Sequence, residues 1–379
     1  MVISILMWIV TGVTISYLIV IGIITYGWFK LSFPVVEKDD SKKVDLSIVI
    51  AVRNEAENIE KLLKQIVKQD YDINCYEVII INDHSTDSTC HLIDQFIHKN
   101  KDVKIKFIQA SGEGKKDALK EGIAMSMAQL IVTTDGDCNV KQGWLKSIVN
   151  YYNSSNCRLI IGPVVYENEK TFLQKFFSLD FASLVASGAG SVDAGLPLMG
   201  NGANLTFERS IYTSLGNSYN SEKYVSGDDV FLIHNVTQKY GAKAIGFLRN
   251  KDAIVSTLSP QNLSDFFKQR NRWASKATGY RMVWPIIVSL TVFLFNMILF
   301  LMLAGSLHFS WLLPVYILII ITKFIIDTPL VFSFLSFTEK SKLKPLLFLM
   351  EFIYPVYIVI VAAASFVFRF TWKERQQLR

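Results

Sequence analysis

Long apolar runs at both ends of the chain constrain its fold more than any other feature. Residues 2–29 contain no charged side chain, and one helical crossing of a bilayer needs about 20 such residues. Further apolar blocks follow near residues 284–304, 311–336 and 346–368. The sequence therefore predicts a transmembrane anchor over residues 1–29. It also predicts a C-terminal membrane region over residues 284–369 with two to three transmembrane helices.

Basic residues flank the first apolar segment on one side only. A cleaved signal peptide carries basic residues before its apolar run, whereas here they follow it, at Lys30, Lys38, Lys42 and Lys43. This order favours a retained anchor whose C-terminal side is cytoplasmic. We therefore expect a multi-pass protein of the cell membrane, with the segment after the anchor in the cytoplasm.

The topology of the C-terminal region stays open. Three crossings would put the basic tail that ends at Arg379 outside the cell, although basic segments favour the cytoplasm. Lys323 and Asp327 lie inside the middle apolar block, where charged side chains are costly. A middle block that is re-entrant, interfacial or part of a cavity is therefore the alternative to three simple crossings.

The charge balance is mildly basic. Lys and Arg number 39 against 33 Asp and Glu, which gives a formal net charge of +6. Such an excess suits an anionic membrane surface or a phosphorylated substrate better than duplex nucleic acid. We expect the membrane as a partner and no nucleic acid. The four cysteines form no CxxC pair, so the sequence does not indicate a zinc site.

Between residues 44 and 281 the pattern changes to short β-branched runs that alternate with amphipathic stretches. This alternation is typical of an α/β domain in which helices cover a mainly parallel sheet. The predicted strands are residues 46–52, 77–81, 104–109, 130–134 and 158–165. The predicted helices begin at Glu55, Ser88, Lys115 and Lys141. Asn54 and Glu57 have the spacing of a capping box for the first helix.

Polar residues follow the first two predicted strands. Ligands of such sheets bind outside the carboxyl ends of the strands. Arg53 and Glu55 follow the first strand, where they could hydrogen-bond a nucleotide base or ribose. Asp83 follows the second strand and could accept hydrogen bonds from the same groups. A helix cap at the first position and a turn-forming aspartate at the second are the competing interpretations.

A glycine-containing segment, GEGKKDAL, precedes one of the predicted helices. It supplies flexible backbone together with Lys115 and Lys116, which could approach a diphosphate at the helix N-terminus. The segment is not a P-loop, because it lacks a second glycine followed by Lys and then Ser or Thr. ATP hydrolysis therefore receives little support from this loop.

The fourth predicted strand ends directly in two carboxylates, Asp135 and Asp137, which are separated by Gly136. Hard oxygen ligands of this kind hold Mg²⁺ or Mn²⁺ and leave coordination positions open for phosphate oxygens. A random DxD is usually a solvated turn. The position of this one after an apolar strand, beside the other strand ends, makes a divalent-metal site the favoured interpretation.

Two later segments carry further polar groups. The run GNGAN supplies backbone for close approach to a ligand and the amides of Asn201 and Asn204 for its hydroxyl groups. An ordinary Gly/Asn loop is the alternative. The run VSGDDVFL places Asp228 and Asp229 before an amphipathic helix. One of these carboxylates could cap the helix, and the other could take a proton from an attacking hydroxyl as a general base.

Just before the C-terminal membrane region, Gln269, Arg272 and Trp273 occur in the order QxxRW. The arginine could bind a diphosphate, and the tryptophan could lie under a sugar ring. The competing interpretation is an amphipathic helix at the bilayer surface, because aromatic and basic residues are mixed in this stretch. Both interpretations can hold at once.

Taken in order, six motifs between Leu46 and Trp273 resemble those of the family-2 inverting glycosyltransferases with the GT-A fold. They are SIVIAVRNE, INDHSTDST, TTDGDC, GNGAN, GDDVFL and QRNRW. The resemblance implies a GT-A domain, a Rossmann-like nucleotide-diphospho-sugar transferase fold, over residues 44–281. The flanking apolar segments are similar to those of the membrane-bound members of this family.

The resemblance also implies a donor, a nucleoside-diphosphate sugar that is commonly a uridine one. In the family pattern Glu55 and Asp83 would lie near the nucleoside, and the DxD carboxylates would lie at the diphosphate and the metal. Together with the strand-end and loop arguments, the expected donor site consists of Arg53, Glu55, Asp83, Lys115 and Asp135. The expected cofactor is Mg²⁺ or Mn²⁺, with Asp135 and Asp137 as its ligands.

By the same match Asp229 resembles the catalytic base, with Asp228 in the place of the family's frequent Glu. The groups expected at the acceptor or the diphosphate are Asn201, Asn204, Asp228, Gln269, Arg272 and Trp273. The chain departs from the family pattern at Ala51 and Val52, where a proline usually follows the first strand. This departure affects the turn more than the chemistry.

Three functions remain open at this level. The chain has fewer membrane blocks than the cellulose and hyaluronan synthases, so transfer of one sugar to a lipid or lipid-linked glycan at the cytoplasmic face, in cell-envelope glycan biosynthesis, is slightly favoured. A processive polysaccharide synthase and a catalytically inert GT-A-like membrane scaffold are the alternatives. A nucleotide-dependent dehydrogenase is excluded, because no GxGxxG follows the first strand.

Overall fold

The computed structural model describes residues 2–31, 43–215, 228–274, 279–280, 282–367, 371–372 and 375–376. Contacts divide the chain into two compact units. The sheet unit comprises Leu31–Asn168 and Met199–Leu258, and the helical unit comprises Met1–Lys30, Glu169–Leu198 and Ser259–Arg379. The sequence predicts one domain over residues 44–281. In the structure, contacts group residues 169–198 and those from 259 onward with the long apolar helices.

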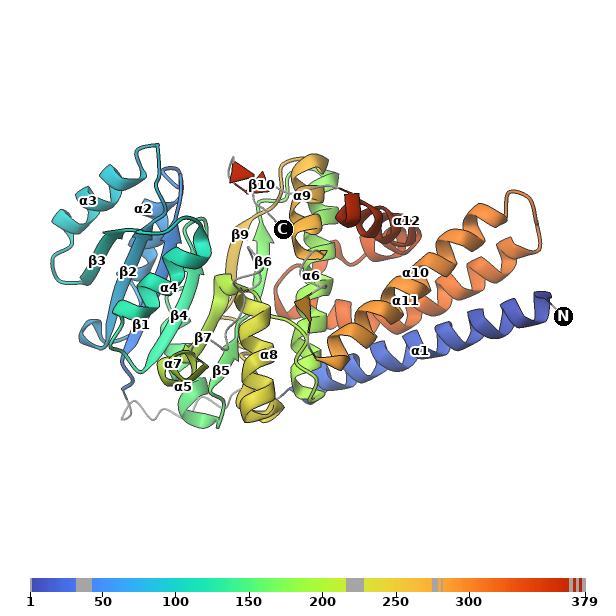
Figure 1. Cartoon of the computed structure of the whole chain (residues 1–379), viewed down its shortest axis with the longest axis horizontal. Helices are drawn as coiled ribbons and strands as arrows, with labels where there is room; N and C mark the ends of the chain where they lie inside the picture. The colour runs from blue at the N-terminus through green and yellow to red at the C-terminus, as the bar shows by residue number, and fades with distance from the viewer. Residues whose placement is uncertain are drawn as a thin grey trace. The chain divides into compact units, whose positions relative to one another are not determined.

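The sheet unit is built on a seven-stranded sheet in the order β3-β2-β1-β4-β7-β5-β8 (Figure 1). Its strands are β1 (Leu46–Val52), β2 (Tyr76–Asn82), β3 (Lys104–Gln109), β4 (Leu130–Asp135), β5 (Leu159–Ile161), β7 (Leu205–Glu208) and β8 (Ile245–Phe247). Strands β3, β2, β1 and β4 pair in parallel, and β5 is parallel to β8. Strand β7 runs antiparallel to both β4 and β5. The predicted α/β fold with a mainly parallel sheet is confirmed.

The prediction of one strand over residues 158–165 is wrong, because this stretch forms two strands in different sheets. Strand β6 (Val164–Glu167) leaves the main sheet and pairs in parallel with β9 (Val255–Leu258). Pro163 lies between β5 and β6 and has no N–H to donate, so it cannot continue the ladder of the first sheet. The ladder ends at Gly162, whose N–H donates to the carbonyl oxygen of Asn204 at 2.8 Å.

The helices of the sheet unit fill the connections between its strands. They are α2 (Ile59–Ile66), α3 (Thr89–Lys99), α4 (Lys115–Met125), α5 (Trp144–Ser154), α7 (Arg209–Leu215) and α8 (Asp228–Tyr240), with the short 3₁₀ turns η1 (Ile73–Cys75), η2 (Gly202–Asn204) and η4 (Ala242–Ala244). Helix α2 buries Ile59, Leu62, Leu63 and Ile66. This spacing places four apolar side chains on one face, as the sequence predicted.

The predicted capping box at the start of α2 is wrong. The helix begins at Ile59 rather than near Glu55, and its N-cap residue makes no side-chain cap hydrogen bond. Asn54 has a positive φ of 52°, and its Oδ1 accepts a hydrogen bond from the Thr86 N–H at 2.8 Å. The loop after β2 therefore determines the conformation of Asn54, which has the residue type of a cap but bonds a distant segment instead.

The helical unit contains α1 (Val2–Lys30), α6 (Phe172–Asp193), α9 (Leu263–Ala274), α10 (Val283–Gly305), α11 (Leu312–Phe337) and α12 (Leu346–Val367), together with η6 (Ser341–Leu343) and the paired strands β10 (Thr371–Trp372) and β11 (Arg375–Gln376). In the described part of the chain, four helical segments are long and apolar enough to cross a membrane: Ser4–Lys30, Val283–Gly305, Leu312–Phe337 and Leu346–Ala364. They coincide with the four apolar blocks of the sequence.

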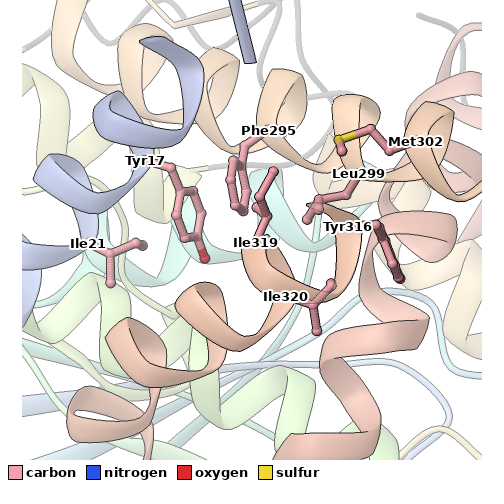
Figure 2. Packing of buried hydrophobic residues seen from close by; sticks show 8 residues of the cluster. All are labelled: Tyr17, Ile21, Phe295, Leu299, Met302, Tyr316, Ile319 and Ile320. Atoms are coloured by element: carbon pink, nitrogen blue, oxygen red, sulfur yellow. The ribbon is translucent and has the colours of Figure 1, made fainter. Parts of the chain in front are cut away.

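Helix α1 belongs to one bundle with the C-terminal apolar helices. It packs against α10 and α11 through a cluster of buried side chains shown in Figure 2. Tyr17 stacks on Phe295 with 4.0 Å between the ring centroids and 12° between the planes. Leu299 of α10 and Ile320 of α11 are fully buried in the same cluster. The N-terminal segment is thus a packed member of the bundle rather than a separate tether.

The two charges inside α11 lie in the interior of this bundle. Lys323 Nζ donates to Asp327 Oδ2 at 2.7 Å and also to Glu351 Oε2 of α12. The Tyr17 hydroxyl donates to both carboxylate oxygens of Asp327, at 2.9 and 2.8 Å. Lys323 and Glu351 are only 3% and 2% exposed. Because α11 is one continuous helix, paired charges inside a bundle account for Lys323 and Asp327 without a re-entrant segment.

Helices α1 and α6 approach one another backbone to backbone. A Cβ atom added at Gly27 would lie 2.0 Å from the Gly190 carbonyl oxygen. One added at Gly190 would lie 2.2 Å from the carbonyl oxygen of Ile24. Both contacts are with backbone, which cannot move aside as the end of a long side chain can. Small residues at a crossing of this kind are typical of helices that associate in membranes.

We expect Gly27→Ala to lower the thermal unfolding temperature of the detergent-purified protein, because an overpacked contact typically costs about 1–3 kcal/mol. Gly22→Ala is the matched control on the same helix, since nothing lies within 4 Å of its added Cβ. Alanine is the better helix former by about 1 kcal/mol, so the control should unfold at the same or a higher temperature. Equal unfolding temperatures for the two variants would contradict the close approach of α1 and α6.

Candidate functional site

The carboxyl ends of three parallel strands meet at one edge of the main sheet. In the observed register Ala51 of β1 lies opposite Asp135 of β4, and Val52 of β1 lies opposite Asn82 of β2. Residues that follow these strands therefore share one edge, as expected for a ligand site of a parallel sheet. The predicted site residues gathered there are Arg53, Glu55, Asp83, Asp135 and Asp137.

Arg53 and Asp83 hold the loops that follow β2 and β3. Arg53 Nη1 donates to the carbonyl oxygens of Asp83 at 2.8 Å and of His84 at 3.2 Å. Asp83 is 1% exposed, and its Oδ1 accepts a hydrogen bond from the Gly114 N–H at 2.9 Å. Gly114 has a φ of 96°, which favours glycine. Asp83 thus fixes the loop before α4, a role that the sequence analysis did not anticipate, and its contact with a nucleoside stays a prediction.

Lys115 connects that loop to the DxD motif. It is the first residue of α4, and its ammonium group forms an ion pair with Asp135 Oδ1. The two side chains retain 33% and 31% of their exposure, so this ion pair is open to solvent. An exposed ion pair is weak enough to exchange one partner for a ligand. The glycine-containing loop and the DxD motif, predicted separately from sequence, therefore meet in the fold.

Asp137 lies among charged neighbours. Its Oδ2 accepts a hydrogen bond from Thr257 Oγ1 of β9 at 3.0 Å. Burial, followed by the negative charges of Asp135 and Glu55, raises the pKa of the Asp137 carboxyl to about 6. The Thr257 hydrogen bond and the charge of Lys115 act in the opposite direction. This edge of the sheet therefore carries an excess of negative charge that a cation would relieve.

Gly136 is required by the position of Glu55. A Cβ atom added at Gly136 would lie 2.9 Å from Glu55 Cγ and 3.3 Å from Val52 Cγ1. Glu55 therefore lies directly against the turn between the two DxD carboxylates. Its Oε2 accepts a hydrogen bond from Asn58 Nδ2 at 3.2 Å. The DxD motif is thus packed against the segment that follows β1.

The carboxylates at this edge suit a cation that is coordinated partly by protein oxygens and partly by oxygens of a bound molecule. Among the described residues, no group of three His, Cys, Asp or Glu side chains could hold a metal ion by itself. Mg²⁺ is usually bound by one or two carboxylates together with phosphate oxygens, rather than in an all-protein cage. Asp135 and Asp137 fit that description, because they supply hard oxygens at a strand end where both residues are half-buried.

The GNGAN turn lies against β4, and one of its backbone N–H groups contacts Asp229. Thr133 Oγ1 of β4 donates to the Gly202 carbonyl oxygen at 2.6 Å. Asn201 caps the turn, since its Oδ1 accepts a hydrogen bond from the Ala203 N–H at 3.0 Å. The Gly202 N–H donates to Asp229 Oδ2 at 3.2 Å. One strand thus carries the DxD motif at its end and also holds the turn that bonds the candidate base.

The prediction that the Asn204 amide binds a ligand is wrong, because this side chain is 2% exposed and bonded inside the sheet unit. Its Nδ2 donates to the carbonyl oxygens of Pro163 and Ala253 at 2.9 and 2.8 Å. Its Oδ1 accepts a hydrogen bond from the Trp144 indole at 3.0 Å. Asn204 therefore ties three segments together, and buried polar groups of this kind are costly to leave unpaired.

Asp229 stands in the first turn of α8. Its Oδ1 accepts a hydrogen bond from the Val230 N–H at 2.8 Å, in addition to the Gly202 contact on its other oxygen. The side chain is half-buried. Backbone N–H groups thus orient both carboxylate oxygens. Asp228 is the first residue of α8, and its side chain lies outside the described part of the protein.

The QxxRW residues lie on α9 in the helical unit. Gln269, Arg272 and Trp273 are half-buried, and Gln269 Oε1 accepts a hydrogen bond from Arg270 at 2.9 Å. Phe266 on the same helix is 1% exposed and stacks on Phe177 of α6 with 4.1 Å between centroids. This aromatic side chain thus packs inside the protein rather than at a bilayer surface. The interfacial-helix interpretation of the whole stretch stays a prediction.

Arg270 is a residue of this motif that the sequence analysis missed. It is 3% exposed, and its Nε donates to Asp180 Oδ2 of α6 at 2.7 Å. Its guanidinium lies 4.6 Å from the Phe266 ring centroid and 4.3 Å from that of Trp273. Burial raises the pKa of Asp180, and Arg270 opposes that shift. The available signal was the helical spacing of Phe266, Arg270 and Trp273, which places an arginine on an aromatic face.

Comparison with known proteins shows two overlapping family matches and relatives that extend over most of the chain. Residues 47–193 match the model for Glycosyl transferase family 2, and residues 130–368 match that for Glycosyl transferase family group 2. The poly-beta-1,6-N-acetyl-D-glucosamine synthase of Staphylococcus epidermidis is 24% identical over 357 residues, which cover 89% of this chain and 82% of that protein.

A second relative and a solved structure extend the comparison. Glycosyltransferase AglE of Haloferax volcanii is 32% identical over 135 residues, which cover 35% of this chain and only 44% of AglE. The mannosyltransferase PcManGT from Pyrobaculum calidifontis, solved in complex with GDP-Man and Mn²⁺, matches with a TM-score of 0.60 and 17% identity over 94% of this chain and 99% of that one. The fold is thus GT-A, and since the second family model spans well over half of the sequence, this chain belongs to the family-2 glycosyltransferases.

Proposed function

We propose that this protein is a metal-dependent, inverting hexosyltransferase. It moves a sugar from a nucleoside-diphosphate sugar, of the uridine class, to a lipid or lipid-linked glycan at the cytoplasmic face of the cell membrane. The observation that carries the proposal is the joint placement of the DxD motif and the Asp229 contact by β4. Family membership supports the reaction class, and PcManGT, with its bound GDP-Man and Mn²⁺, supports a nucleotide-sugar donor and a divalent cation.

The donor lies at the carboxyl edge of the main sheet in this proposal. Arg53, Glu55 and Asp83 surround the nucleoside, and the Lys115 ammonium exchanges its Asp135 partner for a diphosphate oxygen. When bound by Asp135 and Asp137, Mg²⁺ or Mn²⁺ supplies charge neutralisation for the departing diphosphate. The exposed Lys115 pair and the excess of carboxylates at this edge support the assignment.

Asp229 is the general base of the proposed reaction. Its carboxylate takes the proton of the acceptor hydroxyl as that oxygen attacks the anomeric carbon. The bond from the anomeric carbon to the diphosphate oxygen breaks on the opposite face, and the configuration inverts. The hydrogen bonds from Gly202 and Val230 support this role, because they fix the direction of the carboxylate.

The acceptor is the less constrained partner. We assign Asn201, Asp228, Gln269, Arg272 and Trp273 to the acceptor or the diphosphate. The four apolar helices hold the protein in the cell membrane, in a multi-pass arrangement with the catalytic site cytoplasmic. The lysines that follow α1 support this orientation under the positive-inside rule. A membrane-embedded enzyme of this kind suits an acceptor that is itself confined to the bilayer.

A processive polysaccharide synthase is the second candidate. The observation that favours it is the match to the S. epidermidis poly-beta-1,6-N-acetyl-D-glucosamine synthase over 89% of this chain. The QxxRW motif is also similar to that of processive synthases. Both candidates use the same donor site and the same base, so they differ only in whether the product remains bound as the next acceptor.

Chelation tests the metal. We expect removal of divalent cations to abolish transfer and Asp137→Asn to weaken donor binding or turnover, because a carboxamide is a poorer ligand for a hard cation. Transfer is measured as release of nucleoside diphosphate, with readdition of Mn²⁺ or Mg²⁺ as the control for chelation. Activity that survives both treatments would remove the cation from the mechanism.

Substitution of Asp229 tests the base. We expect Asp229→Asn to lower kcat about 10²–10⁴-fold, the usual scale of general acid–base catalysis, with little change in donor affinity. Asp94→Asn, an exposed position on α3, is the matched control and should retain full activity. Normal turnover by Asp229→Asn would move the base to another residue.

Product analysis separates the candidate functions. The purified protein in nanodiscs with native-membrane lipids is incubated with Mn²⁺ and a panel of nucleotide sugars, and the lipid fraction is analysed by mass spectrometry. We expect a lipid that gains one sugar. A ladder of masses would instead establish the processive synthase. Absence of both transfer and donor binding across the panel would favour the inert scaffold.

A further inference from the structure

The second DxD carboxylate is held by a residue from a distant strand. Thr257 Oγ1 donates to Asp137 Oδ2 at 3.0 Å, across 120 positions of sequence. Thr257 lies on β9, which belongs to the small β6-β9 sheet rather than to the strand that carries the DxD motif. None of the six motifs contains this threonine. Its hydroxyl is therefore a contact to a candidate metal ligand that the sequence pattern does not reveal.

The backbone around this contact is fixed from both sides. The Asn139 N–H donates to the Ser256 carbonyl oxygen at 2.7 Å, and the Ser256 N–H donates to the Asn139 carbonyl oxygen at 3.0 Å. Glu167 of β6 reinforces this bridge, because its carboxylate accepts hydrogen bonds from Asn139 Nδ2 at 2.8 Å and from Ser256 Oγ at 2.6 Å. These hydrogen bonds hold the segment after the DxD motif against β9, and they therefore also fix the position of the Thr257 backbone.

Asp137 requires such support because its neighbours repel it. The carboxylates of Asp135 and Glu55 both act on Asp137 as like charges, so electrostatics favour a rotamer that turns away from them. A metal ion needs the opposite arrangement, with Asp135 and Asp137 oxygens converging. A hydrogen bond to one oxygen of a ligating carboxylate fixes the direction of the other.

We propose that Thr257 is a positioning residue that holds Asp137 in the rotamer in which it binds the divalent cation. The inference deepens the proposed function and rests on it, since it assumes that the DxD carboxylates bind a metal. Thr257 touches neither donor nor metal in this scheme. It acts through Asp137, and its effect appears first in metal affinity.

The test measures Mn²⁺ binding to the full-length protein in detergent by electron paramagnetic resonance. Binding is measured with Mn²⁺ alone and with added UDP or GDP. We expect Thr257→Val, which preserves shape and removes the hydroxyl, to weaken Mn²⁺ binding about 10- to 100-fold, the scale of groups that orient metal ligands. Thr257→Ser keeps the donor and should restore binding close to that of the unsubstituted protein.

Ser256→Ala is the matched control on the neighbouring residue. Its hydroxyl bonds Glu167, and the backbone bridge between Asn139 and Ser256 does not need it, so Ser256→Ala should weaken Mn²⁺ binding much less than Thr257→Val does. Equal weakening by Ser256→Ala and Thr257→Val would show that β9 has only a structural role and would overturn the proposal. Unchanged binding by Thr257→Val would overturn it as well.

Asp137→Asn separates failure of this inference from failure of the proposed function. If Asp137→Asn abolishes Mn²⁺ binding while Thr257→Val binds normally, the metal site stands and only the positioning role of Thr257 is lost. If Asp137→Asn also binds Mn²⁺ normally, the DxD motif is not the metal site, and both fall. Thr257→Ala is the second variant should the valine protein not fold, and loss of folding in both would assign Thr257 to stability instead.

Discussion

The position of β4 in the main sheet is the constraint on which the candidate site depends. Its parallel pairing with β1 brings the DxD motif to the edge where the segment after β1 begins, and Glu55 packs against Gly136 there. Its antiparallel pairing with β7 on the other side places Thr133 opposite Leu205, just after the η2 turn. That turn in turn supplies the N–H that bonds Asp229. A single strand therefore carries the carboxylates assigned to the donor and also holds the turn that bonds the carboxylate assigned to the base.

Features that depend on local pattern were predictable from the sequence. Runs such as Leu46–Val52 are too rich in β-branched residues to be anything other than buried strands, and parallel strand ends share an edge by geometry. Features that depend on a distant partner were not. Asn54 has the residue type of a helix cap, but its amide oxygen bonds Thr86. Asn204 has the residue type of a ligand-binding amide, but Trp144 and two carbonyl groups already bond it. In both cases the side chain could make several kinds of hydrogen bond, and residues far away in the sequence determine which one it makes.

In the helical unit, the partner of a buried charged residue could likewise be predicted only where the two residues are close in the sequence. Lys323 and Asp327 are one turn apart, so their pairing could be inferred, whereas Glu351 comes from another helix and Tyr17 from the far end of the chain. Arg270 and Asp180 are separated by 90 positions and are both almost fully buried. Charges inside a low-dielectric region are retained only when paired, because removal of one partner leaves the other uncompensated at a cost of about 3–5 kcal/mol. These pairs therefore fix which helices are neighbours. The Arg270 pair does so for α9, the helix that carries the QxxRW residues.

The charges at the sheet edge also bear on the order in which ligands act. Asp135 and Glu55 act on Asp137 as like charges, and Lys115 acts on it as an opposite charge. In the proposed function, a nucleoside diphosphate adds negative charge beside these carboxylates, and a bound cation offsets it. The cation in turn lacks ligands, because the described side chains do not supply a complete set and phosphate oxygens must contribute. The cation thus offsets the negative charge that disfavours the nucleotide, and the nucleotide supplies the oxygen ligands that the cation lacks. Thermodynamic linkage requires the two effects to be equal, so a nucleotide that raises metal affinity by some factor gains affinity from the metal by the same factor. In the proposed function, cation and donor therefore bind cooperatively, and the exposed ion pair between Lys115 and Asp135 gives way as they bind.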